Sequence, residues 1–308
     1  MQGVPDNNEE AHPQRPRGLF AGLATLDIIH RVGAPPGPNE KITANAQFIA
    51  AGGPAVGAAT AFAALGGEAT LVTVLGTGQV AQMIKHDLAS VNVRVVDIAP
   101  HLDGVAPVSS VIVTEETGDR AVVGGDAAGL IVPAPSSAEL ALLLHPVDVI
   151  VVDGHHPALA RAVAEAASTA EIPSVLDAGH WKPVMADLIP LVTDIVASAD
   201  FRIPGTASSE ATARQLIRDG TPHVIATAGA EVVRWWSGNN SGTVSVPRVS
   251  VVDTLGAGDV FHGAYAFARA RRMEIEHRIV FANRVASMRC ATIGPRRWVS
   301  ALTETQLN

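Results

Sequence analysis

The segment 251–270, VVDTLGAGDVFHGAYAFARA, brings a glycine-rich turn, a carboxylate and the expected start of a helix close together. Gly256 and Gly258 allow unusual backbone angles and a close approach of the backbone to a ligand. The first backbone N–H groups of a helix have no partners within it, and together with the helix dipole they form an anion site. The segment therefore predicts that Gly256, Ala257 and Gly258 form an anion-binding turn next to the carboxylate of Asp259.

An anion site beside a carboxylate is the arrangement that phosphoryl transfer needs. The N–H groups stabilise charge on the transferred group, while the carboxylate takes a proton from the attacking hydroxyl. In an isolated GAGD segment, Asp259 would serve equally well as a helix cap, but the longer context favours a catalytic base. We expect the helix N-terminus to keep the pKa of Asp259 low, so that the carboxylate is ionised at neutral pH.

A regular alternation of strands and helices predicts the scaffold that positions this turn. Residues 18–30 are expected to form one buried strand that ends near Asp27. In the C-terminal half, expected strands at 147–153, 173–178, 194–198 and 223–229 alternate with helices at 157–170, 183–190 and 207–219, before a hairpin at 231–252 and helices at 257–272 and 275–292. Runs of Val and Ile in such strands indicate a parallel sheet covered on both faces.

Two β-rich pieces, 31–51 and 107–125, interrupt the alternation. We expect them to pair into one small sheet outside the main domain, where it would cover Asp27 and Asp259 as a lid. Arg120 in the second piece would close over the substrate or simply be a surface charge. Lids of this kind can pair between subunits, so a homodimer through the lid is expected.

The composition narrows the class of partners. The chain has 308 residues, of which 47% are hydrophobic, and a net charge of −8, which disfavours nucleic acid and anionic membranes. A single cysteine, Cys290, excludes an internal disulfide and fits a reducing compartment. Residues 1–17 are polar and are expected to be a disordered tail, and residues 18–308 one folded domain. No apolar stretch of about 18 residues is present, so the protein is expected to be cytoplasmic.

The motif DTLGAGDVFHGA resembles the C-terminal signature of the PfkB, or ribokinase-like, carbohydrate kinases, over about residues 18–300. The resemblance implies an α/β fold, a three-layer α/β/α sandwich with a mostly parallel sheet and a small β-lid. It implies ATP and Mg²⁺ as cofactors, and transfer of the γ-phosphoryl group to a hydroxyl of a sugar or polyol. It also implies that Asp27 binds substrate hydroxyls, that Gly52 and Gly53 line the sugar pocket, and that Asp259 is the base.

The same resemblance places other residues on the nucleotide side. Thr227 and Gly229 of TAGAEV match a nucleotide-side motif, and Asn283 and the loop ending at Gly294 match the adenine-side wall. Lys182 could reach a phosphate, although such a lysine is more often solvated.

The segment expected to organise magnesium departs from the pattern of the family. Many relatives carry an NxxE motif that organises water around magnesium, whereas this chain has SADF, which leaves Ser198 and Asp200 as polar candidates. Asp253 of DTLGAGD would order the anion-hole loop through a hydrogen bond, the simpler interpretation, or lie near a monovalent cation such as K⁺.

Within the family, the motifs GGPA, DVFHGA and FAxxxAxxxC are most similar to the sulfofructose kinase branch. That branch has an arginine where this chain has His155, so neutral substrates are expected instead; a substrate contact by His155 or His156 competes with a plain surface turn. Gly57 replaces an asparagine that contacts the sugar in many relatives.

Two other functions remain open from the residues. A nucleoside kinase of the same fold would need an aromatic pocket, for which Phe48 is the obvious lid candidate. A non-catalytic sugar or nucleotide sensor would explain the missing NxxE but not the intact GAGD. A Rossmann-type dehydrogenase is excluded, because no G-x-G-x-x-G follows the first strand.

Overall fold

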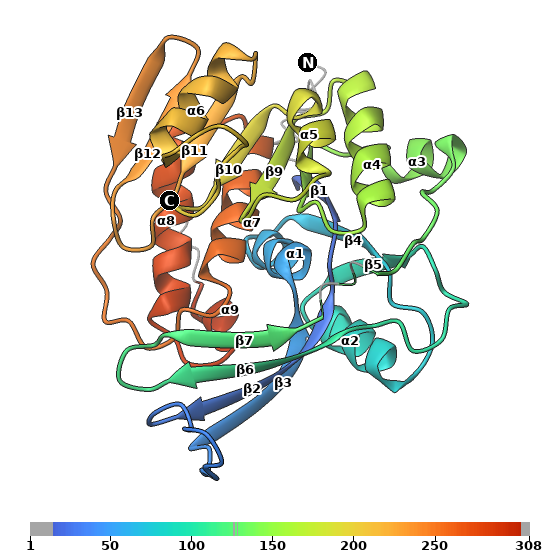
Figure 1. The fold of residues 1–308 in the computed structure, drawn as a ribbon. Helices are drawn as coiled ribbons and strands as arrows, with labels where there is room; N and C mark the ends of the chain where they lie inside the picture. The colour runs from blue at the N-terminus through green and yellow to red at the C-terminus, as the bar shows by residue number, and fades with distance from the viewer. Residues whose placement is uncertain (1–14, 126, 128, 303–308) are drawn as a thin grey trace, which may run out of the picture.

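The computed structural model describes residues 15–125, 127 and 129–302, and its centre is a nine-stranded sheet (Figure 1). The strand order is β13-β12-β11-β10-β9-β8-β1-β4-β5, and all neighbours are parallel except β11–β12 and β12–β13. The strands are β1 (Arg17–Ala21), β4 (Glu68–Thr73), β5 (Val93–Asp97), β8 (Val149–Val152), β9 (Ser174–Ala178), β10 (Asp194–Ala197), β11 (His223–Ala226), β12 (Val233–Ser237) and β13 (Asn240–Val244).

Helices cover both faces of this sheet (Figure 1). Successive strand residues point to opposite faces, so that Phe20 packs into one core cluster and its neighbours Leu19 and Ala21 into the other. The first cluster receives α1 (Pro54–Ala64), α2 (Gln79–Ser90), α7 (Ala257–Ala270), α8 (Ile275–Cys290) and α9 (Arg297–Ala301). The second receives α3 (Ser137–Leu143), α4 (Pro157–Thr169), α5 (Met185–Leu188) and α6 (Ser209–Arg218).

Helices α1 and α7 approach each other very closely. A Cβ atom added at Gly263 of α7 would lie 2.2 Å from the carbonyl oxygen of Ala58 in α1, so only glycine permits this contact. The run of alanines in α1 serves the same purpose, because short side chains let two backbones come together. The contact brings the first turns of both helices, with Gly57 and Asp259, against one another.

A separate four-stranded sheet stands outside the main one, in the order β3-β2-β6-β7 (Figure 1). Its strands are β2 (Thr25–Val32), β3 (Ala46–Gly52), β6 (Val108–Thr114) and β7 (Arg120–Gly124). We call it the lid sheet. It contains strands from both predicted lid pieces, 31–51 and 107–125, and in addition β2.

The prediction of one strand over residues 18–30 is wrong. The chain leaves the main sheet after β1 and enters the lid sheet as β2, and it passes Gly22 on the way. A Cβ atom there would lie 2.2 Å from the carboxylate of Asp153, so this crossing requires glycine. Asp27 consequently belongs to the lid sheet rather than to the end of a central strand.

The fold class predicted from the sequence is confirmed, with smaller corrections. The expected helix 183–190 is shorter, because α5 ends at Leu188 and a 3₁₀ turn over Ile189–Leu191 contains Pro190, which has no N–H to donate. Helices α3 and α9 were not expected. The predicted tail 1–17 is too long at its end, since Arg17 belongs to β1; residues 1–14 lie outside the described part. Over the described ranges, no helix is long and apolar enough to cross a membrane.

Candidate active site

A small cavity lies between the lid sheet and the N-terminus of α7. Among its lining residues are six that the sequence had marked from separate segments: Asp27, Gly52, Gly53, Gly57, Gly256 and Asp259. Its volume is about 60 Å³, room for a few water molecules, whereas ligand sites usually measure about 300–1,000 Å³. A sugar would therefore need the lid sheet and the start of α7 to move apart.

Asp27 presents a partly desolvated carboxylate to the cavity. Thr25 donates its hydroxyl to Oδ1 of Asp27 at 2.6 Å. Burial raises the pKa of Asp27, and hydrogen bonds from Thr25 and Ser109 and the charge of Arg296 oppose that rise. A Cβ atom on Gly52 would lie 1.9 Å from Oδ2 of Asp27, so glycine at position 52 leaves the space that this carboxylate occupies.

The turn before α7 has the geometry that its glycines predicted. Gly256 caps the helix with φ of 71°, in the left-handed region that favours glycine, and α7 begins at Ala257. Oδ1 of Asp253 accepts the N–H of Leu255 at 3.0 Å, which fixes the approach to the turn. Asp259 lies in the first turn of α7, and no side-chain hydrogen bond from the N-cap Gly256 occupies the early N–H groups of the helix, which are therefore available to an anion.

Gly57 packs directly against Asp259. We call Asp259 and the turn before it, residues 256–258, the catalytic turn, after the role that the sequence predicts for them. A Cβ atom at this position would lie 2.4 Å from Cβ of Asp259. An asparagine of the kind found in many relatives therefore has no room here while Asp259 keeps its place. Gly57 lines the cavity through its backbone and exposes the carboxylate instead of adding a polar side chain.

The expectation of a low pKa for Asp259 is wrong. Burial, and to a smaller extent the negative charge of Asp177, raise its pKa to about 7, although His262 and Arg120 act to lower it. The helix N-terminus is a partial charge of about half a unit, too small to offset the removal of the carboxylate from water. A base whose pKa lies near the working pH is well matched to general-base catalysis.

His262 and Asp177 lie beside Asp259 and were given no role by the sequence analysis. Nδ1 of His262 lies 2.7 Å from the carbonyl oxygen of Gly258, within hydrogen-bond distance. Nε2 lies 3.4 Å from both Oδ1 of Asp177 and the carbonyl oxygen of Val196. Two signals could have found them: His262 follows Asp259 by almost one helical turn, and Asp177 lies in β9, near its carboxyl end.

His155 and Lys182 converge on Asp153 rather than on the cavity. Oδ1 of Asp153 accepts the backbone N–H of His155 at 2.8 Å and lies 3.2 Å from its Nδ1, while Oδ2 accepts the N–H of Leu23 at 2.9 Å. Lys182 donates to the carbonyl oxygen of Asp153 at 2.8 Å. Although burial raises the pKa of Asp153, the charges of His155 and Lys182 hold it below its ordinary value.

The residues assigned to the nucleotide side make local contacts. Ser198 donates to the carbonyl oxygen of Gly179 at 2.6 Å, Thr227 to that of Ala197 at 3.3 Å, and Asn283 to that of Ser245 at 3.3 Å. Gly229 has φ of 60°, which glycine favours. These contacts hold the segments that follow β10, β11 and β13 in place.

The residues predicted to handle magnesium, Ser198 and Asp200, do not form a magnesium site. Asp200 lies on an exposed turn, and its N–H donates to the hydroxyl of Ser198 at 3.2 Å. Within the described ranges, Asp177, Asp259 and His262 form one group that could hold a metal ion, but Mg²⁺ prefers oxygen ligands to a histidine nitrogen.

Two arginines line the cavity, and a third, Arg120, lies near enough to Asp259 to lower its pKa. Arg296, which the sequence analysis missed, donates from Nη2 to Oδ2 of Asp87 at 2.6 Å and to the carbonyl oxygen of Ala51 at 2.7 Å. Arg289 also lines the cavity and is buried. Arg120 is exposed, and its Nη1 lies 3.4 Å from the carbonyl oxygen of Thr254.

The lid sheet docks on the loop before the catalytic turn. The carbonyl oxygen of Gly118 accepts both the N–H of Thr254 at 3.0 Å and its hydroxyl at 2.8 Å. Arg31 of β2 donates to the carbonyl oxygen of Val252 at 2.7 Å. These contacts hold the lid against residues 252–254.

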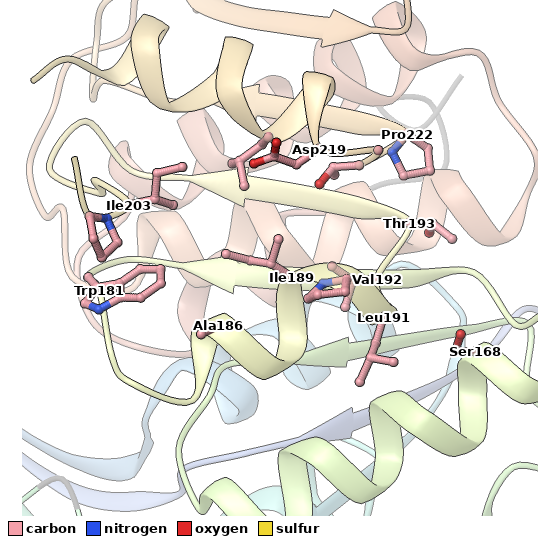
Figure 2. A pocket seen from close by; sticks show the side chains of 15 residues that line it. Ser168, Trp181, Ala186, Ile189, Leu191, Val192, Thr193, Ile203, Asp219 and Pro222 are labelled. Carbon is pink, nitrogen blue, oxygen red and sulfur yellow. The ribbon is translucent and has the colours of Figure 1, made fainter. Parts of the chain in front are cut away.

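A second cavity, of about 580 Å³, lies on the other helix layer (Figure 2). Its labelled lining includes Trp181, Ile189, Ile203 and Asp219. It contains none of the residues predicted for substrate, nucleotide or catalysis, and the small cavity at Asp259 is therefore the candidate active site.

Comparison with known proteins agrees with the geometry. A model of the pfkB family of carbohydrate kinases matches residues 19–301. Ribokinase of Bacillus subtilis (strain 168) is 25% identical over 289 residues, which cover 92% of this chain and 96% of the relative.

Solved structures show the same fold. Ribokinase of Arabidopsis thaliana, complexed with ribose and ATP, has a TM-score of 0.76 at 20% identity and covers 96% of this chain and 97% of its own. Phosphofructokinase-2 of Escherichia coli, in complex with substrates and products, has a TM-score of 0.69 at 18% identity and covers 90% and 94%.

Proposed function

Because the chain belongs to the pfkB family of carbohydrate kinases, we propose that it transfers the γ-phosphoryl group of ATP to a hydroxyl, most simply a primary alcohol, of a sugar or polyol. The observation that carries this proposal is the cavity in which Asp27 of the lid sheet and Asp259 of α7 meet beside the Gly256 turn.

The residues of the cavity have separate roles in the proposed reaction. Asp27 accepts hydrogen bonds from substrate hydroxyls and orients the acceptor. Asp259 takes the proton from the attacking hydroxyl as the bond to phosphorus forms. The free N–H groups at the start of α7 stabilise the negative charge on the transferred phosphoryl group. Gly52 and Gly57 leave room for the two carboxylates.

Lid closure accounts for the exclusion of water. The cavity is far smaller than a sugar site needs, so the lid sheet opens to admit substrate and closes over it. Excluding water protects ATP from hydrolysis and strengthens the electrostatic interactions of the transferred group. Magnesium would enter with the nucleotide, held mainly by phosphate oxygens and water.

The charges around the cavity favour a neutral acceptor. The guanidinium of Arg296, which lines the cavity, is already paired with Asp87. A sulfonate or phosphate on the substrate would therefore compete with that carboxylate for Arg296. Sulfofructose is consequently not the expected substrate, despite the motif similarity.

We also propose a cytoplasmic homodimer that pairs through the lid. Apolar side chains on the lid sheet are unusually exposed: Ile49 is 53% exposed, Val122 52% and Val123 77%. Strands β3 and β7 form the two edges of that sheet, and open edges with apolar side chains tend to pair.

The two alternative functions, a nucleoside kinase and a non-catalytic sensor, would require different properties of the same cavity. A nucleoside kinase would need an aromatic surface for the base; Trp298 lines the cavity, but it is only 1% exposed. A sensor would bind sugar or nucleotide without turnover.

A screen of ATP turnover against ketoses, aldoses, polyols, nucleosides and sulfofructose tests the proposal. Neutral sugars or polyols should give the highest kcat/KM. A preference for nucleosides would replace the substrate class, a preference for sulfofructose would refute the charge argument, and binding without turnover would indicate a sensor.

A further inference from the structure

A buried arginine lies where the sequence allowed a monovalent cation, next to Asp253. Nη2 of Arg289 is 3.1 Å from Oδ2 of Asp253. Nη1 donates to the carbonyl oxygen of Thr292 at 2.8 Å and lies 3.5 Å from the carbonyl oxygen of Asp253 itself. One guanidinium thus contacts a carboxylate and two carbonyl oxygens, the type of oxygen atoms that a K⁺ ion would need.

Both charges are deeply buried, which makes their pairing obligatory. Arg289 is 2% exposed and Asp253 is 3% exposed. A buried charge without a partner is strongly unfavourable. The guanidinium of Arg289 therefore neutralises the charge of Asp253 from within the chain. A second cation placed among the same oxygen atoms would be repelled by the positive charge of Arg289.

The Asp253 carboxylate connects the catalytic turn to the end of α8. Oδ1 accepts the N–H of Leu255 at 3.0 Å, directly before Gly256, and Oδ2 accepts the N–H of Gly294 at 3.1 Å. The N–H groups of Val252 and Asp253 donate to the carbonyl oxygen of Cys290 at 2.9 and 3.2 Å. The cation beside Asp253 consequently decides how firmly the anion-binding turn is held.

We propose that the guanidinium of Arg289 takes the place of a monovalent cation beside Asp253, so that the catalytic turn is ordered without K⁺. The proposal rests on the proposed kinase function and concerns its regulation by ions. It assigns Arg289 a positioning role, since the residue acts on the turn through Asp253. The expected K⁺ site does not fit this chain, because its oxygen atoms are already in use.

The first test uses the unmodified protein. Its thermal midpoint and its affinity for a non-hydrolysable ATP analogue, measured by calorimetry with MgCl₂, are compared in KCl and in tetramethylammonium chloride at equal ionic strength. We expect the midpoint to be unchanged and the Kd to differ by less than about twofold. A K⁺-dependent rise in the midpoint, or a tenfold tighter Kd, would overturn the inference. Absence of analogue binding would instead refute the nucleotide side of the proposed function, and the midpoint would still decide the ion question.

The second test removes the internal cation. Arg289→Ala leaves Asp253 unpaired and opens space for an ion, so its thermal midpoint and kcat should fall and recover with KCl but not with tetramethylammonium; we expect at least a tenfold recovery of kcat. Arg284→Ala is the matched control, an exposed arginine of the same helix, and should be unaffected. If the alanine variant does not fold in either salt, Arg289→Lys keeps a positive charge and should fold without K⁺. A lysine variant that folds only with K⁺, or an alanine variant indifferent to K⁺, would contradict the proposal.

Discussion

Replacing Asp259 by asparagine tests the centre of the mechanism. The change keeps the size and some capping ability of the side chain, but the amide cannot accept the proton of the attacking hydroxyl. General-base catalysis contributes about 10²–10⁴-fold, so kcat should fall by that factor. The backbone N–H groups of the catalytic turn are unchanged, and the affinity for ATP should therefore change little.

The same substitution should make the protein more stable, which a helix-cap role would not allow. The pKa of Asp259 is raised from 3.8 to about 7 in the fold. Each pKa unit corresponds to about 1.4 kcal/mol, so ionising this carboxylate in the fold costs about 4 kcal/mol more than in the unfolded chain. Burial of the amide offsets part of this, and we expect Asp259→Asn to raise the free energy of unfolding by about 1–4 kcal/mol at pH 8.

The sign of the pH dependence follows from the same pKa. Between about pH 4 and pH 7 the folded protein holds a proton on Asp259 that the unfolded chain has released. The contribution of Asp259 to stability therefore falls as the pH rises through this window. The asparagine variant lacks that contribution, so its advantage over the wild type should grow from pH 5 to pH 8.

The assay combines kcat, ATP affinity and urea unfolding at pH 5 and pH 8 on one set of variants. Asp219→Asn, at an exposed position after α6, is the matched control and should change none of them appreciably. If Asp259→Asn keeps its activity and is less stable than the wild type, Asp259 is a helix cap and the catalytic assignment fails.

Three further outcomes follow from the cavity. Asp27→Ala should raise KM for the sugar strongly, because a hydrogen bond to a charged group contributes about 1.5–3 kcal/mol, while ATP affinity is preserved; unchanged sugar kinetics would remove Asp27 from the substrate site. A plot of kcat/KM against pH should rise to a plateau above about pH 7, the pKa of Asp259, and a profile flat from pH 5 to 8 would contradict that pKa. Gly57→Ala should lower kcat more than tenfold, because its Cβ atom would lie 2.4 Å from that of Asp259. The control is Gly66→Ala, at a glycine with a positive φ and open space around it, which should reduce stability alone. Equal kcat for both variants would show that Gly57 does not position the base.

The catalytic turn could be predicted because its information is local. Gly256, Gly258 and Asp259 lie within four consecutive positions, and the physics of a helix N-terminus depends only on those neighbours. The alternation of strands and helices predicted the main sheet for the same reason. Where one residue redirects the chain, as Gly22 does between β1 and β2, the pattern of apolar residues carried no sign of the change.

The rest of the site depends on contacts between distant segments. Arg289, Arg296 and His262 each have an ordinary sequence context. Their partners are distant in the chain: Asp253 before α7 for Arg289, Ala51 of the lid sheet for Arg296, and Asp177 of β9 for His262. The pKa of Asp259 was predicted in the wrong direction because the helix dipole is a local effect, whereas burial and the proximity of Asp177 are tertiary.

The division of the cavity between two sheets has a consequence for how such an enzyme diversifies. Asp27 and Gly52 belong to neighbouring strands of the lid sheet, whereas Asp259 belongs to a helix packed on the central sheet. On the proposed function, recognition of the acceptor and the transfer step therefore reside in different segments of the chain. Exchange of residues 25–52 between related chains should change the acceptor preference more than the transfer step, provided that the contacts of Arg31 with Val252 and of Ala51 with Arg296 are kept.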